Sequence, residues 1–512
     1  MHHALYGLAE NPALPPELVD RLISAADDDL AAELAYRPDL DRGQIAALAR
    51  FETAAARLAR DGRLTADEVD PVVQPLVALA MLEEHSGRPE WARLLAADPQ
   101  ADIREKLAAC PDLPDDVAQT LASDPDVRVV SELASWARPD IAARLASHPH
   151  AEVRRALAAN EMTPPSVLTA LITGHGLPPA RSCLVCEREP TPYVHDPGCE
   201  RTDCTLPLGA SCDGSHESTV LVMRQAALGN PATPVEAVVE FADHPSMLLR
   251  RELAARTDLP PHLYARLTED VIPWVRATLA DNPAIDETLI LALSADRGHD
   301  VQHRLTHHPR IPLDVLAHLV DITRIDSLLL PRIASATPRE VEELAASPKP
   351  AMRMLLAQRR DLPARIRDVL AADPDAKVVK AIAPHPGLSE TQLRGMIARH
   401  GVRVLAKVAA NPDATPALLE DVARHQPPAR KAFREIAEHR NATAASLLIC
   451  LADHQARPRA ARHSALPAAV VADLIDDDEW QVVEAAAANP SLPYAVMSRL
   501  LPAPRPLRRP VG

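Results

Sequence analysis

The chain has 512 residues, more than one compact core usually supports, so either several globular domains or one extended stack of repeats is expected. Hydrophobic residues make up 47% of the chain but aromatic residues only 2%, which favours closely packed helices built on Leu, Ala and Val. The net charge of −16 argues against broad binding to nucleic acid. Because no membrane-length apolar run or signal-peptide pattern occurs, we expect a cytoplasmic protein without a membrane partner. Arginine far outnumbers lysine, as in proteins from high-GC bacteria.

A short dipeptide recurs along the chain at near-multiples of about 26 residues, which is the signature of a repeat architecture. We call its first residue the landmark of each repeat. The clearest copies are Asn230-Pro231, Asn282-Pro283, His308-Pro309, His385-Pro386, Asn411-Pro412 and Asn489-Pro490. We expect the asparagines to bond main-chain groups at the turn and not to be ligands.

Each repeat predicts two helical pieces. In the second piece apolar residues recur at helical spacing, as at Val153 and Leu157, and form one stripe that neighbouring repeats must bury. A proline shortly after the landmark is expected at the first position of the next helix, often behind a capping Thr. These prolines are Pro164, Pro234, Pro260, Pro312, Pro416 and Pro493. Asp-Pro pairs such as Asp98-Pro99, Asp124-Pro125 and Asp373-Pro374 are expected to cap and start the second piece.

The pattern L-A-x-D-P-x-x-x-V-R-x-x-L-A-x-N-P-x-x-P-x-x-V resembles the leucine-rich repeat variant family and, through its Asp/Arg pair six residues apart, the HEAT repeat. It is clearest at 95–117, 145–167 and 370–393. The resemblance implies an all-α fold, a right-handed α-solenoid or superhelix of about sixteen repeats of about 24–26 residues. It carries little information about function.

An arginine recurs at equivalent positions of several repeats, at Arg104, Arg154, Arg250, Arg276, Arg353 and Arg403. Stacked repeats would align these arginines, so they could form an anion-binding stripe. We favour a structural ladder, in which each arginine meets an acidic or capping residue of its own or the next repeat.

The repeats predict four regions: N-terminal helical repeats at 1–176, a cysteine-rich insertion at 177–217, C-terminal helical repeats at 218–501 and a Pro/Arg tail at 502–512. Residues 38–90 lack the Asn-Pro landmark, and residues 318–345 match the repeat weakly. Asn160 and Asn230 are separated by much more than one repeat, which places the insertion in the loop between two helices of one repeat. We expect the tail to be disordered.

The insertion carries five cysteines with the spacing C-x2-C-x12-C-x4-C-x7-C: Cys183, Cys186, Cys199, Cys204 and Cys212. A C-x2-C pair followed by a second pair suits tetrahedral Zn²⁺, and the metal would supply folding free energy that this segment lacks. His195 and His216 are substitute ligands.

A [4Fe–4S] cluster is the alternative to zinc, because proteins of the resembled family are joined to such a cluster. The cluster precedes the repeats in that family, however, and no C-x2-C-x2-C run is present here. A third alternative is a set of free or redox-active thiols. We expect Cys110 and Cys450 to be plain buried thiols.

No catalytic motif is evident, so the favoured function is a non-catalytic scaffold that binds a protein or peptide, with a metal-stapled insertion. The alternative is a redox or metal-sensing protein in which the insertion is the working site. A HEAT-like DNA glycosylase, with stacking residues among Trp91, Trp136, Trp274 and Trp480, is less favoured because of the acidic charge.

Overall fold

The computed structural model describes residues 2–183, 217–323, 325 and 328–502. Within these ranges the chain forms α-helices and short 3₁₀ helices and no strand, apart from one isolated β-bridge between His150 and Ser182. The prediction of an all-α fold is confirmed. The right-handed solenoid of about sixteen repeats stays a prediction. No helix in the described part of the chain is both long and apolar enough to cross a membrane.

The described chain forms two compact units. The central unit begins at Val69 and contains the helices α6 (Pro75–Glu83), α7 (Pro89–Leu95), α8 (Ala101–Ala108), α9 (Asp115–Leu121), α10 (Val127–Trp136), α11 (Pro139–Leu145), α12 (Ala151–Ala159), α13 (Pro165–Thr173), α15 (Glu217–Gly229), η2 (Val235–Ala237), η3 (Val239–Asp243), α16 (Met247–Ala255), α17 (Pro261–Thr268), α18 (Pro273–Ala280), α19 (Glu287–Ser294), α20 (His299–Leu305) and α21 (Leu313–Ile322). The short helix α22 (Pro331–Ala334) follows α21 in the chain.

The terminal unit combines the residues up to Glu68 with those from Ile333 onward. It contains α1 (His2–Glu10), α2 (Pro16–Ala25), α3 (Asp28–Leu34), α4 (Arg42–Leu48), α5 (Glu52–Arg60), η1 (Ala66–Glu68), α23 (Pro338–Ala345), α24 (Pro350–Leu356), α25 (Ala364–Ala371), α26 (Ala376–Ile382), α27 (Glu390–His400), η4 (Gly401–Arg403), α28 (Leu405–Ala409), α29 (Pro416–Ala423), α30 (Arg430–Glu438), α31 (Ala444–Cys450), α32 (Arg457–Arg462), α33 (Ala468–Asp473), η5 (Leu474–Asp476), α34 (Trp480–Ala487) and α35 (Tyr494–Leu500).

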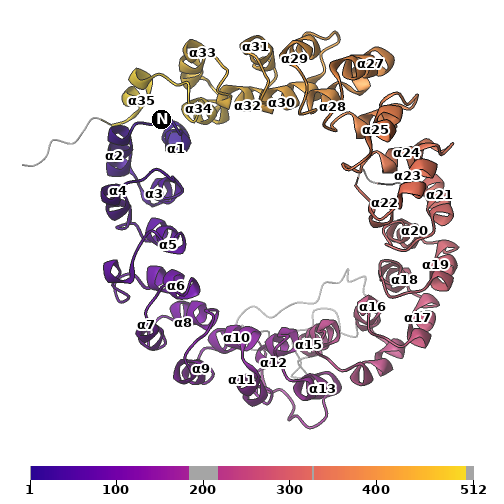
Figure 1. Ribbon diagram of the computed structural model, residues 1–512. Helices are drawn as coiled ribbons and strands as arrows, with labels where there is room; N and C mark the ends of the chain where they lie inside the picture. The colour runs from indigo at the N-terminus through magenta and orange to yellow at the C-terminus, as the bar shows by residue number, and fades with distance from the viewer. Residues whose placement is uncertain (1, 184–216, 324, 326–327, 503–512) are drawn as a thin grey trace, which may run out of the picture. The chain divides into compact units, whose positions relative to one another are not determined.

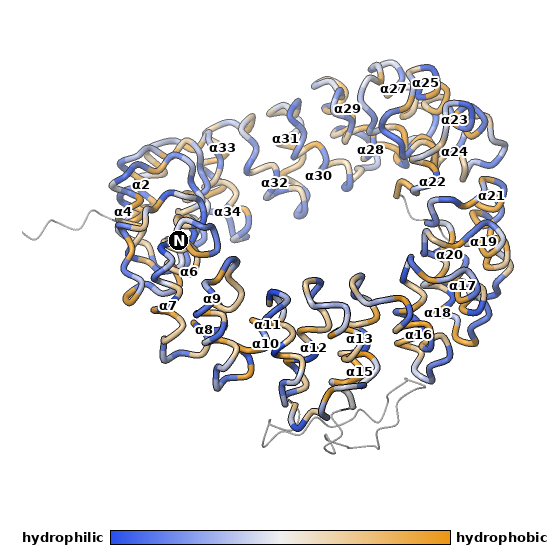
Figure 2. The backbone as a smooth tube through the Cα atoms, turned by 60° about the horizontal axis from the view of Figure 1, so that its bottom comes forward, coloured by the Kyte–Doolittle hydropathy of each residue, from blue (hydrophilic) through white to orange (hydrophobic). Residues whose placement is uncertain are grey.

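Helices of the central unit lie in two rows (Figure 1). One row runs α8, α10, α12, α15, α16, α18 and α20, and consecutive members pack side by side. The other row contains α7, α9, α11, α13, α17, α19 and α21. Apolar and polar positions alternate along each helix (Figure 2), as expected for helices that bury one stripe. The core is aliphatic: Leu107, Leu157 and Leu279, one from each of three helices of the first row, are fully buried.

The landmark side chains join consecutive repeats by donating to main-chain carbonyls of the repeat before. In the central unit, Nδ2 of Asn230 donates to the carbonyls of Ala158 at 2.9 Å and Asn160 at 3.0 Å. Nδ2 of Asn282 donates in the same way to Ala254 and Arg256, both at 2.7 Å. Each asparagine Oδ1 also accepts from the main-chain N–H two residues later, which closes its own turn. Each asparagine therefore bonds main-chain groups, as expected, and these groups belong to two repeats: its own and the one before.

Arginine and histidine also occupy the landmark position. Nη1 of Arg256 donates to the carbonyls of Leu228 and Asn230, and the carboxylate of Asp258 holds the same guanidinium. Nε2 of His308 lies 2.9 Å from the carbonyl of Asn282. In the terminal unit Arg37, Arg63 and Arg359 make equivalent bonds. Within residues 38–90, which lack an Asn-Pro landmark, Arg63 supplies the same donors to the carbonyls of Ala35 and Arg37.

In the terminal unit the pattern runs from the end of the chain into its beginning. Nδ2 of Asn489 donates to the carbonyls of Ala461 and His463, at 2.7 and 3.0 Å. Nδ2 of Asn11 donates to the carbonyls of Ala487 and Asn489, both at 2.8 Å. Helix α1 consequently packs against α34 as though it were the next repeat.

Gly7 allows α1 to approach α34 closely. A Cβ atom at this position would lie 2.1 Å from the carbonyl oxygen of Glu484 and 2.7 Å from Cβ of Ala487. Only glycine leaves room for the neighbouring main chain, so this residue sets the spacing of the two helices.

Several predicted helix starts are wrong by a few residues. Of the prolines expected at the first helical position, only Pro416 lies there, behind the capping Thr415. The others are themselves N-caps, because their extended conformation suits the residue before a helix: Pro164, Pro234, Pro260, Pro312 and Pro493. Likewise Asp98, Asp124 and Asp373 each accept from the N–H two residues later, and the helix begins one residue beyond that N–H.

Candidate functional site

The candidate site lies where the first row of the central unit meets the start of the cysteine-rich insertion. Three observations mark this place: an interrupted series of Arg–Asp pairs, a buried arginine without a carboxylate, and the buried residue Cys183.

Four helices carry an arginine as their fourth residue that bonds an aspartate twenty residues later, in the next repeat. Nε of Arg104 donates to the carboxylate of Asp124 at 2.7 Å, while Nη1 of the same guanidinium donates to the carbonyl of Asp98. Hydrogen bonds to Asp124 raise the pKa of Arg104. The remaining pairs are Arg250–Asp270, Arg276–Asp296 and Arg353–Asp373.

The structure thus favours the ladder over the anion-binding stripe. The carboxylate comes from the next repeat, whereas the residue six positions earlier contributes its main-chain carbonyl and not its side chain. The prediction that Arg403 belongs to the series of aligned arginines is wrong, because this residue is exposed in η4, before α28. The paired guanidinium groups have little capacity left for an anion.

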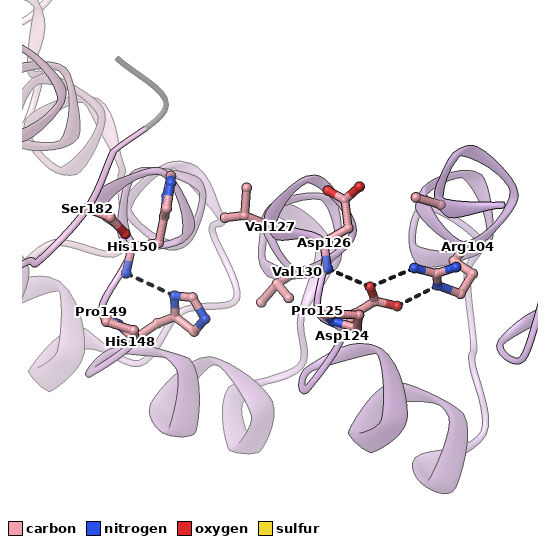
Figure 3. Close-up of a pocket in the computed structure, with 11 residues that line it drawn as sticks. Arg104, Asp124, Pro125, Asp126, Val127, Val130, His148, Pro149, His150 and Ser182 are labelled. Atoms are coloured by element: carbon pink, nitrogen blue, oxygen red, sulfur yellow. Dashed lines mark hydrogen bonds and ion pairs between the residues drawn. The ribbon is translucent and has the colours of Figure 1, made fainter. Parts of the chain in front are cut away.

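The series is interrupted between α10 and α12. Val130 is the fourth residue of α10, where the neighbouring helices carry arginine, and His148 replaces the aspartate of the next repeat. Figure 3 shows Arg104 and Asp124 bonded on one side and His148 on the other, with Val130 between them. An open pocket of about 560 Å³ occupies this place.

His148 in this pocket is held as a neutral imidazole. Its Nδ1 accepts from the N–H of His150 at 3.1 Å, so the ring proton of the neutral form lies on Nε2. Burial, followed by the electrostatic influence of the neighbouring His150 and Arg154, lowers the pKa of His148. It therefore does not replace the carboxylate of the regular series.

Arg154 is the fourth residue of α12 and lacks a carboxylate partner among the described residues. Its side chain is only 6% exposed. Nε donates to the carbonyl of His148 and Nη1 to that of Pro178, both at 2.7 Å, but Nη2 has no hydrogen-bond partner in the described part of the chain. Burial lowers the pKa of Arg154, whereas the paired arginines 104, 276 and 353 have raised pKa values. Among the described residues, no carboxylate therefore compensates this buried positive charge beside the insertion.

The chain is anchored to α12 immediately before the insertion. The N–H of Arg181 donates to the carbonyl of Pro149 at 2.7 Å, and the N–H of Ala151 donates to the carbonyl of Ser182 at 2.9 Å. Cys183 follows directly and is fully buried. The other predicted ligands lie outside the described residues: Cys186, Cys199, Cys204 and Cys212, with the substitutes His195 and His216.

Within the described ranges, no group of three or more His, Cys, Asp or Glu side chains is arranged to hold a metal ion. Cys110 and Cys450 are buried thiols, as predicted, and burial raises the pKa of each to about 12. Of the tryptophans considered for stacking, Trp91 is buried, whereas Trp274 is 46% exposed beneath the guanidinium of Arg251.

Sequence analysis did not identify the pocket. The signals were present: Val130 stands in the arginine column, and His148-Pro149-His150 stands where the preceding repeat has Asp124-Pro125-Asp126. In the structure Val130 and His148 lie next to each other, so the two changes together remove one Arg–Asp pair from the series.

Comparison with known proteins assigns no family. No protein-family model matches the chain, and no curated protein matches it. Eleven chains of solved structures match in backbone arrangement. One, titled as the crystal structure of an engineered protein from the Northeast Structural Genomics Consortium, is 13% identical, covers 94% of this chain and 93% of its own, and gives a TM-score of 0.13. A likeness at this TM-score supports no conclusion about fold or function.

Proposed function

We propose that the protein is a non-catalytic binding scaffold of the cytoplasm: a right-handed α-solenoid of about sixteen repeats, similar to leucine-rich repeat variant and HEAT proteins, that engages a protein or peptide. The observation that supports it is the bonding of one landmark to the next, for example Asn230 to Asn160 and Asn282 to Arg256. Such bonding makes each repeat contact its neighbours, and stacked repeats present the extended surfaces that partners bind.

We further propose that the insertion is folded around a metal ion, with Cys183 and Cys186 as the first pair of ligands and Cys199 and Cys204 as the second. Cys212, His195 and His216 are substitutes. Thiolate-rich donor sets suit Zn²⁺, which would supply a structural cross-link and no redox chemistry. The anchored, buried Cys183 is compatible with this role.

The metal is tested on the full chain purified without oxygen. We expect about one zinc per chain by metal analysis, and replacement of both Cys183 and Cys186 with Ser should remove it while helicity by circular dichroism is largely kept. Cys110→Ser is the matched control, because this thiol is buried in a helical repeat and should leave the zinc content unchanged.

The alternative to zinc is an iron–sulphur or thiol-based sensor that uses the same cysteines. Iron together with absorption at about 400 nm would establish the cluster and contradict zinc.

Binding is tested with the immobilised chain in cytoplasmic extract, followed by a titration of the captured protein in purified form. We expect saturable binding of a protein or peptide. Absence of such a partner, combined with tight binding of duplex DNA at about 150 mM salt, would contradict the scaffold and favour a nucleic-acid enzyme.

A further inference from the structure

Helix α1 of the terminal unit lies between α34 and α3 (Figure 1), and aromatic side chains stay exposed where the three helices adjoin. The ring of His3 lies 4.7 Å from that of Trp480, which is 49% exposed. The ring of Tyr6 meets that of His2 edge to face at 5.0 Å. Exposed rings that gather in one place are typical of interaction surfaces. We call this surface the acidic aromatic face and define it by His3, Tyr6, Asp29, Glu33, Trp480 and Glu484.

Carboxylates from two helices surround the aromatic rings of this face. Burial raises the pKa of Tyr6, and the negative charges of four neighbouring carboxylates raise it further. These carboxylates belong to Asp27, Asp29, Glu33 and Glu484. Burial, followed by the charge of Glu10, also raises the pKa of Glu484. The face therefore presents a negative potential to a charged ligand.

The carboxylates that define the face are not engaged by a basic side chain of the repeats. Within the described part of the chain, no Lys or Arg nitrogen lies within 4 Å of the carboxylate of Asp29 or Glu33. The carboxylate of Glu484 meets only the imidazole of His3, at 3.7 Å. These three groups are consequently available to a cationic ligand.

A pocket of about 350 Å³ adjoins the face between the ends of α1 and α3. Its apolar wall consists of Ala9, Pro12, Tyr36 and Pro38. Of the acidic groups that line it, Glu10 is held by Arg462 and Asp39 by Arg37. The carboxylate of Glu33 also lines the pocket and is the one that stays available. The site thus suits a ligand that combines apolar rings with positive charge.

The chain itself contains a segment of this chemistry, and the segment begins close to the face. Residues 503–512 of the Pro/Arg tail lie outside the described residues and read APRPLRRPVG, with three prolines and three arginines. The structure does describe where the tail starts. Nη2 of Arg21 in α2 donates to the carbonyls of Leu501 at 3.2 Å and Pro502 at 3.0 Å. The tail therefore starts beside α2, which lies between α1 and α3 in the chain.

The length of the tail is sufficient to cross the face. Neighbouring helices pack about 8–10 Å apart, so the path from α2 to the far side of α1 is roughly 20 Å. Ten residues in the extended conformation that prolines favour span about 31 Å. An arginine side chain adds further reach at each of three positions.

We propose that the Pro/Arg tail, residues 503–512, binds to the acidic aromatic face of its own chain. Its arginines pair with the carboxylates of Glu33 and Glu484, and its prolines pack against the rings of Tyr6 and Trp480. Proline-rich segments are recognised in this way because they are already extended and lose little entropy on binding to aromatic surfaces. The inference goes beyond the scaffold proposed above and does not depend on it, since it needs no second protein.

Attachment to the same chain is what makes modest contacts sufficient. A short tethered segment has an effective concentration in the millimolar range at a site that it can reach. Ion pairs at a partly exposed face are weak one at a time, and several of them act together here. An outside ligand of this face has to displace the tail.

The test measures competition between the tail and the same segment added as a peptide. The probe is a fluorescein-labelled peptide of residues 503–512, followed by fluorescence anisotropy at about 50 mM salt, where exposed charges are weakly screened. An acceptor chain of full length carries Arg505→Glu, Arg508→Glu and Arg509→Glu, which release its own tail. We expect saturable binding to the acceptor chain and at least about tenfold weaker binding to the wild-type chain, whose tail occupies the face.

Variants of the acceptor chain locate the binding. Glu33→Gln removes an available carboxylate and should weaken peptide binding at least about threefold. Asp29→Asn, at an exposed position of α3, is a second variant and should act in the same direction. Glu287→Gln is the matched control, because Glu287 is exposed in α19 of the other unit, and it should leave binding unchanged.

Three results would each overturn the inference: no saturable binding of the peptide, equal binding to the wild-type and acceptor chains, or equal effects of Glu33→Gln and Glu287→Gln. Sedimentation at several concentrations separates the tail of the same chain from that of a second copy. We expect no association that depends on the three arginines, and association of that kind would overturn the inference. Failure in any of these measurements leaves the proposed scaffold untouched, because capture of a partner from extract is measured separately.

Discussion

The side-chain amide of Asn230 donates to the main-chain carbonyl of Asn160 at 3.0 Å, across 70 residues of sequence. Its companion bond to the carbonyl of Ala158 spans the insertion as well, whereas the landmark bonds of Asn160, Arg256, Asn282 and His308 each span one repeat. Helices α12 and α15 therefore pack as neighbours, although residues 160–216 lie between them in the chain.

Replacing a landmark asparagine tests how much these bonds stabilise the fold. Asn411 donates to the carbonyls of Ala383 and His385 at 2.6 and 2.7 Å and is fully buried. Asn411→Asp removes the donor and places a charge there, so we expect a loss of about 2–4 kcal/mol in the free energy of unfolding, measured with urea. Asn411→His is the matched control, because His385 and His308 occupy the same position elsewhere, and it should cost less than half as much.

Gly7→Ala should destabilise the terminal unit, because the added Cβ would clash with the carbonyl of Glu484. We expect a loss of about 2–3 kcal/mol. Gly395→Ala is the control: its Cβ would meet only the end of the Arg399 side chain at 3.5 Å, so within α27 it should stabilise by roughly 0.5–1 kcal/mol. Thermal melts compare the two variants, and equal effects would show that the contact of α1 with α34 does not limit stability.

Breaking one Arg–Asp pair should be costly because both partners are largely buried. The side chains of Arg353 and Asp373 are 14% and 5% exposed. Asp373→Asn leaves the guanidinium without its counter-charge, and we expect a loss of about 3 kcal/mol in unfolding free energy. Arg339→Gln breaks a pair that is 90% and 59% exposed and should change stability by less than about 0.5 kcal/mol. Similar losses from the two changes would contradict the structural role of the ladder.

Stability should fall in mild acid through the buried landmark histidines. Burial lowers the pKa values of His308 and His385 below the ordinary value of 6.5. The unfolded chain therefore binds protons at a pH where the folded chain does not, so stability is complete above about pH 6.5 and is lost as the pH falls below it. His308→Asn keeps the donor without the titrating ring, and the slope of unfolding free energy against pH between about 5 and 6.5 should become shallower. An unchanged slope would assign the acid sensitivity to other groups.

The sequence was sufficient to predict the fold class, because the aliphatic spacing and the recurring landmarks are local features. It was insufficient where different residues make the same bond. Arg37 and Arg63 make the landmark bonds without an Asn-Pro pair, because a guanidinium reaches the equivalent main-chain carbonyls of the repeat before. The spacing of residues in the sequence does not reveal that an asparagine amide and an arginine guanidinium can make the same hydrogen bonds.

The candidate site was predictable only in part. The cysteine spacing predicts metal ligands from Cys183 onward; Cys183 itself is buried, and the metal-ligand role stays a prediction. The pocket beside it depends on Val130 and His148, which lie on different helical repeats and are unremarkable one at a time. Their combined effect, the loss of one Arg–Asp pair from the series, is a property of how the repeats stack.

The stacking of α1 on α34 also constrains the order in which the chain can fold during synthesis. The ribosome releases Gly7 and Asn11 early, but the carbonyls that Asn11 bonds belong to residues 487 and 489 and emerge hundreds of residues later. The central unit has all its helices by then and is free to fold first. The packing of α1 is thus among the last to be completed, and until then the face of α1 that meets α34 stays uncovered on the translating ribosome.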